Sequence, residues 1–425
     1  MDLTATLTST LLENHRLDWL SSEFVQPAYE NQSIANVPAT LCHWYGIPPI
    51  HGDPLRTEII APMEGKIKRI ILLLVDALAL HQLQTWMQAG KTPVWNRLLE
   101  NGLLAPLTSI VPSTTTAAMT TFWSGRTPAE HGVLGYELWL KEYGMVTNMI
   151  AQAPMSFKSG HSSLSQAGFV PENALAVPTL GTHLMQHGVQ PYSFQHYAIL
   201  HSGLSRTFMK DVSLQGYDTH AELWVNVRQL IDTHPHERQY IWVYTGEFDG
   251  LGHHYGPDDE RAELAFLNFS HNFEHNFIDR LTPQQRDETL VLLTADHGQV
   301  TTPPYRNLLL AHHPEFLNAL HIKPTGENRL AYLHVKPGKA RFIQEYVEEH
   351  WPDSFYLYES LKLLESGLFG AGEPDKHTID RIGDLTLLAR NQQYLWWSED
   401  ENILRGRHGG LTPKEMLVPF LASHL

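Results

Sequence analysis

The sequence predicts an α/β fold, a three-layer sandwich with a mostly parallel central sheet and a small α+β insertion. Apolar runs at residues 70–75, 240–244 and 289–294 are rich in Ile, Leu, Val and aromatic side chains, which is typical of strands buried on both faces. Segments with helical spacing separate these runs, and strands that alternate with helices indicate a parallel sheet.

Composition limits the class of protein. A chain of 425 residues is long enough for a large domain that carries a smaller one. The 46 Asp and Glu side chains outnumber the 30 Lys and Arg, which disfavours a scaffold for nucleic acids. No apolar run approaches the roughly 20 residues that span a bilayer, and the N-terminus lacks the pattern of a secretory signal. We therefore expect a cytoplasmic protein without a membrane partner, whose one cysteine, Cys42, is a buried or idle thiol.

The first quarter of the chain is predicted to be an arm followed by a βα unit. Residues 1–65 contain repeated prolines that break any long element, so we expect an N-terminal arm packed on the main domain. After the strand at 70–75, residues 77–101 show helical spacing that is interrupted at Gly90 and Pro93.

Strands and helices continue to alternate in the middle of the chain. A short strand ends at Pro112, and a turn rich in hydroxyl side chains then begins a helix that stops at Gly125. Helix, strand and helix are predicted next, in the segments 180–189, 191–200 and 221–237. The strand at 240–244 is followed by GEFDGLGHHYGP, a glycine-rich segment crowded with ligand-type side chains, and then by the helical residues 260–281.

The last part of the chain contains the insertion. Short strands and helices in residues 328–390 predict a small α+β unit that covers one edge of the sheet. Residues 66–327 and 391–425 then form the main domain, and MLVPFLA near the C-terminus is predicted to be its final core strand.

Asp and His side chains follow each of the buried strands. Asp76 ends the first strand, Asp249 and His253 come after the second, and Asp296 and His297 come after the third. The carboxyl ends of parallel strands lie at one edge of the sheet, where open α/β sheets place their ligands. Carboxylates gathered in one crevice repel each other, and a pair of divalent cations relieves that repulsion.

Another imidazole, His408, lies in a loop bounded by glycines, and Asp and His are ligand types that zinc accepts. Taken singly, each of these side chains has an alternative role as a helix cap or a surface residue. The turn 112–116 supplies hydroxyl groups at the predicted start of a helix, where free N–H groups favour an anion. A hydroxyl held against a metal there is a nucleophile, with simple N-capping as the alternative.

Five motifs make the chain resemble a known family, and they lie within residues 70–420 in the family's order. The motifs are VDAL, PSTTTAAMTTFWSGRTPAEHGV, FDGLGHHYGP, TADHG and GRHGGLTPKEMLVP. With them the sequence resembles the alkaline phosphatase superfamily, and most of all its type I phosphodiesterase/nucleotide pyrophosphatase family. The resemblance implies an alkaline phosphatase-like sandwich and two divalent metal ions, with zinc the expected metal and manganese the alternative. It also implies a small phosphorylated substrate, of which a nucleotide is one candidate.

The family's pattern also implies roles for individual residues. One metal ion would be bound by Asp76, Thr115, Asp296 and His297, and the second by Asp249, His253 and His408. The family's spacing to the glycine at position 125 selects Thr115 as the nucleophile, with Thr114 and Thr116 as alternatives.

One departure from the family's pattern concerns substrate binding. The family usually places an asparagine shortly after its H-G pair to hold a phosphate oxygen, whereas here Tyr136 stands in that region. Tyr136, Arg206 and Lys210 are the candidate contacts to substrate.

The hypothesis from the sequence is a phosphodiesterase or nucleotide pyrophosphatase that acts through a phosphothreonine. A phosphomonoesterase or phosphonate hydrolase of the same superfamily is the alternative, and a catalytically silent metal- or ligand-binding domain is the alternative from another class. A sulfatase is disfavoured because no C/S-x-P-x-R sequence follows Cys42 or lies near Thr115.

Overall fold

The computed structural model describes residues 1–13, 17–156, 160 and 163–425. Its larger sheet has the strand order β2-β16-β9-β1-β8-β6-β7. The strands are β1 (Arg69–Val75), β2 (Gly102–Thr108), β6 (Gln190–His196), β7 (Ser213–Tyr217), β8 (Gln239–Thr245), β9 (Thr289–Thr294) and β16 (Leu417–His424). The final strand β16 runs antiparallel to both its neighbours, and the other neighbouring pairs are parallel. The sheet is therefore mostly parallel, as predicted.

The central position of β1 explains its composition. All seven of its residues are buried, because β8 and β9 lie on either side and helices cover both faces. Val75 pairs with Thr245 of β8, and Leu74 pairs with Thr294 of β9. The segments that follow these three strands consequently leave the sheet at the same level, which brings their side chains together.

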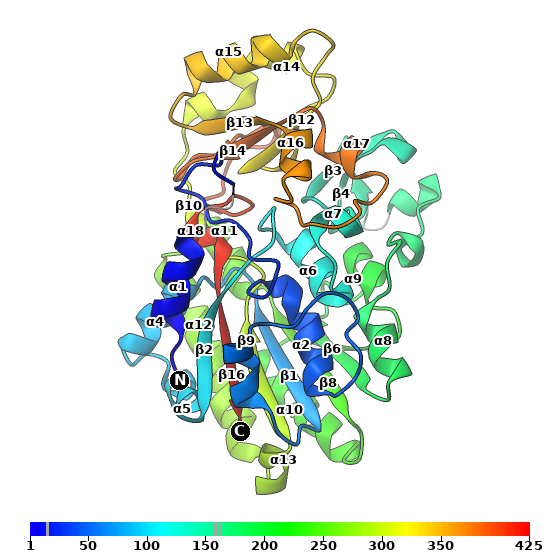
Figure 1. Cartoon of the computed structure of the whole chain (residues 1–425), viewed down its shortest axis with the longest axis vertical. Coiled ribbons are helices and arrows are strands. Elements are labelled where there is room, and N and C mark those ends of the chain that lie inside the picture. Colours follow the sequence, from blue (N-terminus) through cyan, green and yellow to red (C-terminus); the bar gives the residue numbers. More distant parts are fainter. Residues whose placement is uncertain (14–16, 157–159, 161–162) are drawn as a thin grey trace.

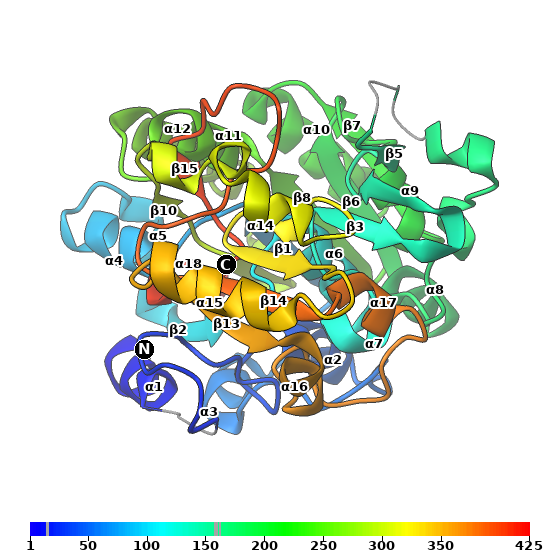
Figure 2. The same cartoon turned by 90° about the horizontal axis from the view of Figure 1, so that it is seen from above.

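Helices form a layer on each face of the sheet, which confirms the three-layer prediction (Figure 2). One layer contains α2 (Val37–Trp44), α6 (Thr115–Ser124), α8 (Leu180–Gln186) and α9 (Gly203–Phe208). The other contains α4 (Leu80–Gln88), α5 (Pro93–Asn101), α10 (His220–Thr233), α11 (Glu247–Tyr255) and α12 (Glu260–Asn276). Aromatic side chains stack between neighbouring helices of this layer, for example Trp95 of α5 on Phe273 of α12 with ring centroids 5.2 Å apart.

A second, antiparallel sheet lies above the carboxyl end of the first (Figure 1). Its strand order is β13-β14-β12-β11-β3-β4-β5. The strands are β3 (Glu137–Leu140), β4 (Met145–Asn148), β5 (Ala153–Pro154), β11 (Thr325–Glu327), β12 (Leu330–Leu333), β13 (Phe355–Glu359) and β14 (Leu385–Ala389). Within 328–390 the structure has the strands β12, β13 and β14 and the helices α15 (Ala340–His350), α16 (Ser360–Glu365) and α17 (Thr378–Ile382), of which α17 was not predicted. The sheet extends beyond that segment, because 137–154 contributes three strands to it.

The first 65 residues contain only short helices where they are described, namely α1 (Thr4–Leu12), α2 and α3 (Thr57–Ile60). They contact the sheet directly, since the Leu3 N–H donates to the carbonyl of Leu104 at 2.8 Å. Cys42 on α2 is fully buried, and burial raises the pKa of its thiol to about 11. Short elements complete the described chain: α7 (Pro128–His131), α13 (Pro283–Asp287), α14 (Pro314–Asn318), α18 (Pro413–Met416), β10 (Val300–Thr301) and β15 (Gly406–Arg407).

The glycine-rich segment after β8 is helical, an assignment that the sequence did not provide. It forms the nine-residue helix α11, although glycine is a poor helix former. A Cβ atom at Gly252 would lie 2.2 Å from Oε1 of Gln299, so glycine is needed there for close packing rather than for a turn. Within the described residues, no helix combines the length and apolarity required to span a membrane.

Candidate active site

Asp76, Asp296 and His297 form a buried cluster at the carboxyl end of the larger sheet, here called the inner group. Potential ligand atoms of the three lie within 4.8 Å of one another. Asp76 directly follows β1, and the other two follow β9 after a single residue. Ala77 adopts a left-handed conformation with φ of 63° and donates its N–H to Asp296 Oδ1 at 3.1 Å. Backbone strain therefore accompanies the alignment of the two carboxylates.

The inner group has more negative charge than its surroundings balance. Oδ1 of Asp76 and Oδ2 of Asp296 are buried without a hydrogen-bond partner among the described residues. Burial, followed by the charges of Asp296 and Asp249, raises the pKa of Asp76 well above its ordinary value. Burial likewise raises the pKa of Asp296. Unpartnered oxygens that converge in this way are suited to a cation.

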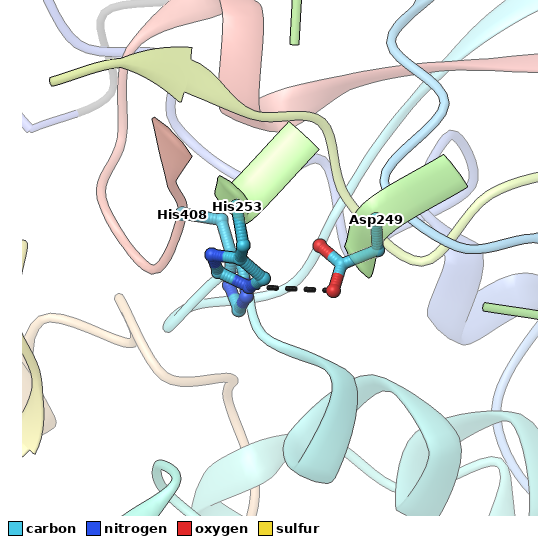
Figure 3. Close-up of side chains that lie close together, drawn as sticks. All are labelled: Asp249, His253 and His408. Atoms are coloured by element: carbon cyan, nitrogen blue, oxygen red, sulfur yellow. Dashed lines mark ion pairs between the residues drawn. The ribbon is translucent and has the colours of Figure 1, made fainter. Parts of the chain in front are cut away.

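Asp249, His253 and His408 form a second cluster, here called the outer group (Figure 3). Asp249 and His253 lie one turn apart on α11, so both side chains project from the same face of the helix. His253 Nε2 lies 3.3 Å from Asp249 Oδ2. His408 comes from the loop after β15, and its ring stacks on that of His297 with centroids 3.9 Å apart. The two groups are therefore adjacent.

Backbone carbonyls fix the orientation of all three imidazoles. Nδ1 of His253 lies 2.9 Å from the carbonyl oxygen of Gly406, and Nδ1 of His408 lies 3.1 Å from that of Ser113. Nδ1 of His297 lies 3.0 Å from the carbonyl oxygen of Gly298. A carbonyl oxygen accepts a hydrogen bond from Nδ1–H, so in the neutral ring the proton is on Nδ1 and the lone pair of Nε2 is free. This arrangement is the one that metal-binding histidines usually have.

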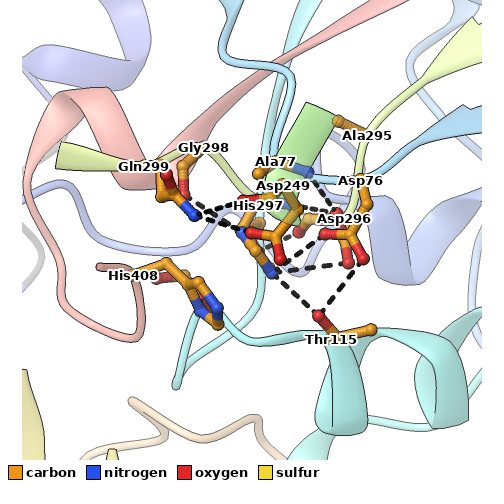
Figure 4. A network of polar contacts seen from close by, with 12 residues as sticks. Asp76, Ala77, Thr115, Asp249, Ala295, Asp296, His297, Gly298, Gln299 and His408 are labelled. Atoms are coloured by element: carbon orange, nitrogen blue, oxygen red, sulfur yellow. Dashed lines mark hydrogen bonds and ion pairs between the residues drawn. The ribbon is translucent and has the colours of Figure 1, made fainter. Parts of the chain in front are cut away.

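Thr115 faces the inner group from the first residue of α6 (Figure 4). Its Oγ1 lies 3.2 Å from His297 Nε2 and 3.5 Å from Asp76 Oδ2. Thr114 is the N-cap residue of the helix, and Thr116 is fully buried. Of the three threonines of the turn, Thr115 thus has the hydroxyl that contacts the predicted metal ligands.

The three predicted substrate contacts differ in their positions relative to the two groups. The hydroxyl of Tyr136 accepts a hydrogen bond from Asn148 at 2.5 Å, and the Tyr136 N–H donates to Glu327 Oε1 at 2.7 Å. Arg206 pairs with exposed Glu172, whose Oε1 lies 2.9 Å from Nε and 2.7 Å from a terminal guanidinium nitrogen. Lys210 is exposed. The structure therefore brings the predicted ligands and Thr115 together but does not bring Arg206 or Lys210 to them, and the binding role of Tyr136 stays a prediction.

Sequence reasoning missed three residues around the site. Tyr244 of β8 donates its hydroxyl to Asp76 Oδ2, and Gln299 donates from Nε2 to Asp249 Oδ1 at 2.7 Å. Glu327 reaches the site from β11 of the second sheet, and burial raises its pKa to about 8. Nothing in the sequence distinguishes Tyr244 from other aromatic residues in strands, and Glu327 lies in none of the motifs. Gln299 offered a signal, because it directly follows the D-H-G sequence.

Solved structures share this fold. Murine ectonucleotide pyrophosphatase/phosphodiesterase 5 is similar with a TM-score of 0.62 and 15% identity, over 83% of this chain and 87% of that chain. An inactive variant of that protein in complex with AMP gives the same values. Phosphonoacetate hydrolase from Sinorhizobium meliloti 1021, in complex with phosphonoacetate, has a TM-score of 0.61 and 16% identity, over 84% of this chain and 90% of that chain.

Sequence comparison gives the family. No curated protein matches the chain. The family model for type I phosphodiesterase/nucleotide pyrophosphatase, however, matches residues 70–411 and so covers most of the chain. The predicted resemblance is confirmed, and the chain belongs to the type I phosphodiesterase/nucleotide pyrophosphatase family of the alkaline phosphatase superfamily.

Proposed function

We propose that this protein is a two-metal phosphohydrolase that cleaves phosphodiester or pyrophosphate bonds through a phosphothreonine. One observation carries the proposal: the hydroxyl of Thr115 lies 3.2 Å from His297 and 3.5 Å from Asp76, beside buried carboxylate oxygens that have no hydrogen-bond partner among the described residues. A hydroxyl next to an uncompensated anionic cluster is poised for reaction only if cations are present, which is the arrangement of a metal-assisted nucleophile.

The residues suit a pair of divalent cations, for which zinc is the proposed metal and manganese the alternative. Asp76, Asp296, His297 and Thr115 would hold one ion, and Asp249, His253 and His408 the other. Bound ions of this kind lower the pKa of a hydroxyl or water and stabilise the charge of the departing oxygen. The neutral Nε2 atoms and buried carboxylates are the nitrogen and oxygen ligands that zinc accepts.

The proposed reaction has two displacement steps: transfer of the phosphoryl group to Thr115, and hydrolysis of the resulting phosphothreonine. Thr115 gives up its hydroxyl proton to solvent, Oγ1 forms a bond to phosphorus, and the leaving oxygen departs with the electron pair of its bond and takes up a proton from solvent. The N-terminus of α6 directs backbone N–H groups toward the anionic phosphoryl group. Water then attacks the phosphothreonine from the opposite side, the bond to Oγ1 breaks, and Thr115 regains a proton.

The relatives support two candidate substrate classes. The AMP complex of the murine protein favours nucleotides, and that structure carries a threonine-to-alanine substitution described as inactive. A phosphonate is the second candidate, because the bacterial hydrolase of similar fold is complexed with phosphonoacetate.

Replacing the proposed nucleophile tests the function. Thr115→Ala should abolish turnover of bis(p-nitrophenyl) phosphate while zinc content measured by mass spectrometry stays unchanged. Thr115→Ser is the matched control, and it should retain measurable activity because it keeps a hydroxyl. Trials of p-nitrophenyl phosphate, p-nitrophenyl sulfate and phosphonoacetate with zinc and manganese distinguish the substrate classes. Undiminished activity of Thr115→Ala with full zinc content would end the assignment.

A further inference from the structure

A hollow of about 120 Å³ opens beside Thr115, on the side of Tyr244. Its buried floor contains Met119, Phe208 and Trp242. Among the residues that the structure describes, no charged side chain lines it, and none of the three outer-group residues does so. The hollow is therefore an apolar extension of the site that adjoins the nucleophile.

The hydroxyl and amide groups in the wall of the hollow form hydrogen bonds within the protein. Ser205 Oγ donates to Gln195 Oε1 at 3.1 Å, and Gln195 Nε2 donates to Ser193 Oγ at 2.9 Å. The hydroxyl of Tyr244 is committed to Asp76. A bound group thus meets hydroxyl and amide groups that already have partners, whereas the indole Nε1 of Trp242 is a buried donor with no hydrogen-bond partner among the described residues. A ligand with many hydrogen-bonding groups would therefore lose its contacts with water and gain few in return.

The helix α9 presents its uncharged side to the hollow. Leu204, Ser205 and Phe208 line the hollow, as residues one turn apart on one helix face do. Arg206 does not line it, because its guanidinium group is held by Glu172. Arg206 is consequently unavailable to neutralise a charged ligand there, and Lys210, which directly follows Met209, does not line the hollow.

We propose that this hollow binds a compact, uncharged apolar group of the substrate, about the size of a single aromatic ring. The inference rests on the proposed function and specifies its substrate class. A dry cavity of roughly 150 Å³ lined by apolar side chains is known to accommodate benzene, so the size is comparable to one ring. A nucleoside carries sugar hydroxyls and base edges, which this wall does not satisfy.

The position of the hollow assigns it to the group that remains on phosphorus. In an in-line displacement the leaving oxygen lies opposite Thr115, on the far side of phosphorus. The hollow instead includes Thr115 itself and Tyr244, the partner of Asp76. The expected substrate is therefore a diester or phosphonate ester with one small apolar substituent, and the expected product keeps that substituent.

Two p-nitrophenyl diesters that share a leaving group test this specificity. With the zinc-loaded full chain, p-nitrophenyl phenyl phosphate should have a kcat/KM at least about tenfold above that of p-nitrophenyl thymidine 5′-phosphate. Binding is measured independently by isothermal titration calorimetry, where phenylphosphonate should bind at least about tenfold more tightly than AMP.

Substitutions at the rim of the hollow test whether the selectivity for phenylphosphonate over AMP depends on the hollow. Ile199 is half-buried at the rim, and Ile199→Asp should weaken phenylphosphonate binding at least about tenfold, because it places a carboxylate beside the apolar group. Ile150→Asp makes the same change from another segment and serves if the first variant folds poorly. Ile379→Asp is the matched control, since Ile379 is 60% exposed on α17 and does not line the hollow.

The outcomes separate this inference from the proposed function. If phenylphosphonate binds tightly but neither diester is hydrolysed, the result supports the assignment of the hollow as a binding site for an apolar group. The same result rejects the proposed hydrolase activity. If the diesters are hydrolysed but AMP binds more tightly than phenylphosphonate, the proposed specificity of the hollow is wrong. The proposed hydrolase activity then still stands. Unchanged phenylphosphonate binding in a folded Ile199→Asp or Ile150→Asp variant also overturns the assignment.

Discussion

The inner and outer groups lie side by side at the same edge of the sheet and contain the same kinds of side chain, but their burial differs. In the inner group the side chain of Asp76 is 3% exposed and those of Asp296 and His297 are 0% exposed. In the outer group Asp249 is 16% exposed and His253 is 26% exposed. The outer group is therefore more accessible to water than the inner one.

Charge balance follows this difference. Burial raises the pKa of Asp249 and His253 lowers it, with a net downward shift, while the same pairing raises the pKa of His253. The outer group can thus compensate its own carboxylate by protonating an imidazole. In the inner group the pKa of Asp76 is raised by burial and then by two other carboxylates. The comparison teaches that the inner group depends on an added cation, whereas the outer group is stable without one.

The largest expected effect comes from removing one carboxylate from each group. Asp296→Asn should reduce zinc binding at the inner group and lower kcat/KM by roughly 10³-fold, because a metal supplies several kcal/mol of charge stabilisation. Asp249→Asn should lower kcat/KM by a smaller factor, about 10²-fold, since water can replace a ligand at the more exposed group. Zinc content and kinetics on bis(p-nitrophenyl) phosphate measure both. A larger loss of activity and zinc in Asp249→Asn than in Asp296→Asn would reverse the comparison.

The next effect concerns the support of Asp76. Tyr244→Phe removes the hydroxyl that donates to Asp76 Oδ2, so zinc affinity at the inner group should fall about 10- to 100-fold. Competition with a fluorescent zinc chelator measures the affinity. Tyr45→Phe is the control, because its buried hydroxyl donates to Gln239 at the opposite end of β8. Equal zinc affinity in the two variants would show that Tyr244 has no positioning role.

A smaller effect with opposite signs is expected for the metal-free protein. With zinc removed by a chelator at pH 8, Asp76→Asn should raise the free energy of unfolding by about 1–2 kcal/mol, because it removes one of several buried like charges. Asp249→Asn should instead lower it by about 1–2 kcal/mol, because His253 loses its partner. Urea unfolding measures both values, and shifts of the same sign would contradict the difference in charge balance.

The smallest effect is expected at Gln299. Its Nε2 holds Asp249 Oδ1 at 2.7 Å, and Gln299→Ala should weaken zinc binding at the outer group by about tenfold. The inner group is the internal control, since a two-site zinc titration reports both affinities in one experiment. A loss confined to the inner group would mean that the two sites are assigned the wrong way round.

Most of the fold was predictable because local patterns reflect it. The run at 70–75 was recognisable as a central strand since all its side chains had to be apolar, and its neighbours β8 and β9 carried the same signal. The helix α11 was not assigned, because its glycines obscured the helical pattern. Gly252 is glycine for packing against Gln299, a contact between distant parts of the chain that no local rule describes.

The candidate site was predictable to the extent that it lies in motifs. Asp76, Asp296 and His297 follow strands whose ends coincide, so parallel pairing was enough to place them together. Glu327 was not predictable, because it arrives from the second sheet and pairs with the backbone of Tyr136. Arg206 was selected for its charge alone, and its ion pair with Glu172 could not be foreseen from sequence.

The sequence by itself determined which segments become buried strands, which ligand-type residues follow them and in what order, because strand burial and chain order are properties of local sequence. Only the tertiary structure decided that one acidic group is more deeply buried than the other. It also decided that the imidazoles present Nε2 and that the described lining of the hollow beside Thr115 contains no charged side chain. Burial and electrostatic balance depend on which distant segments meet, and that meeting exists only in the folded chain.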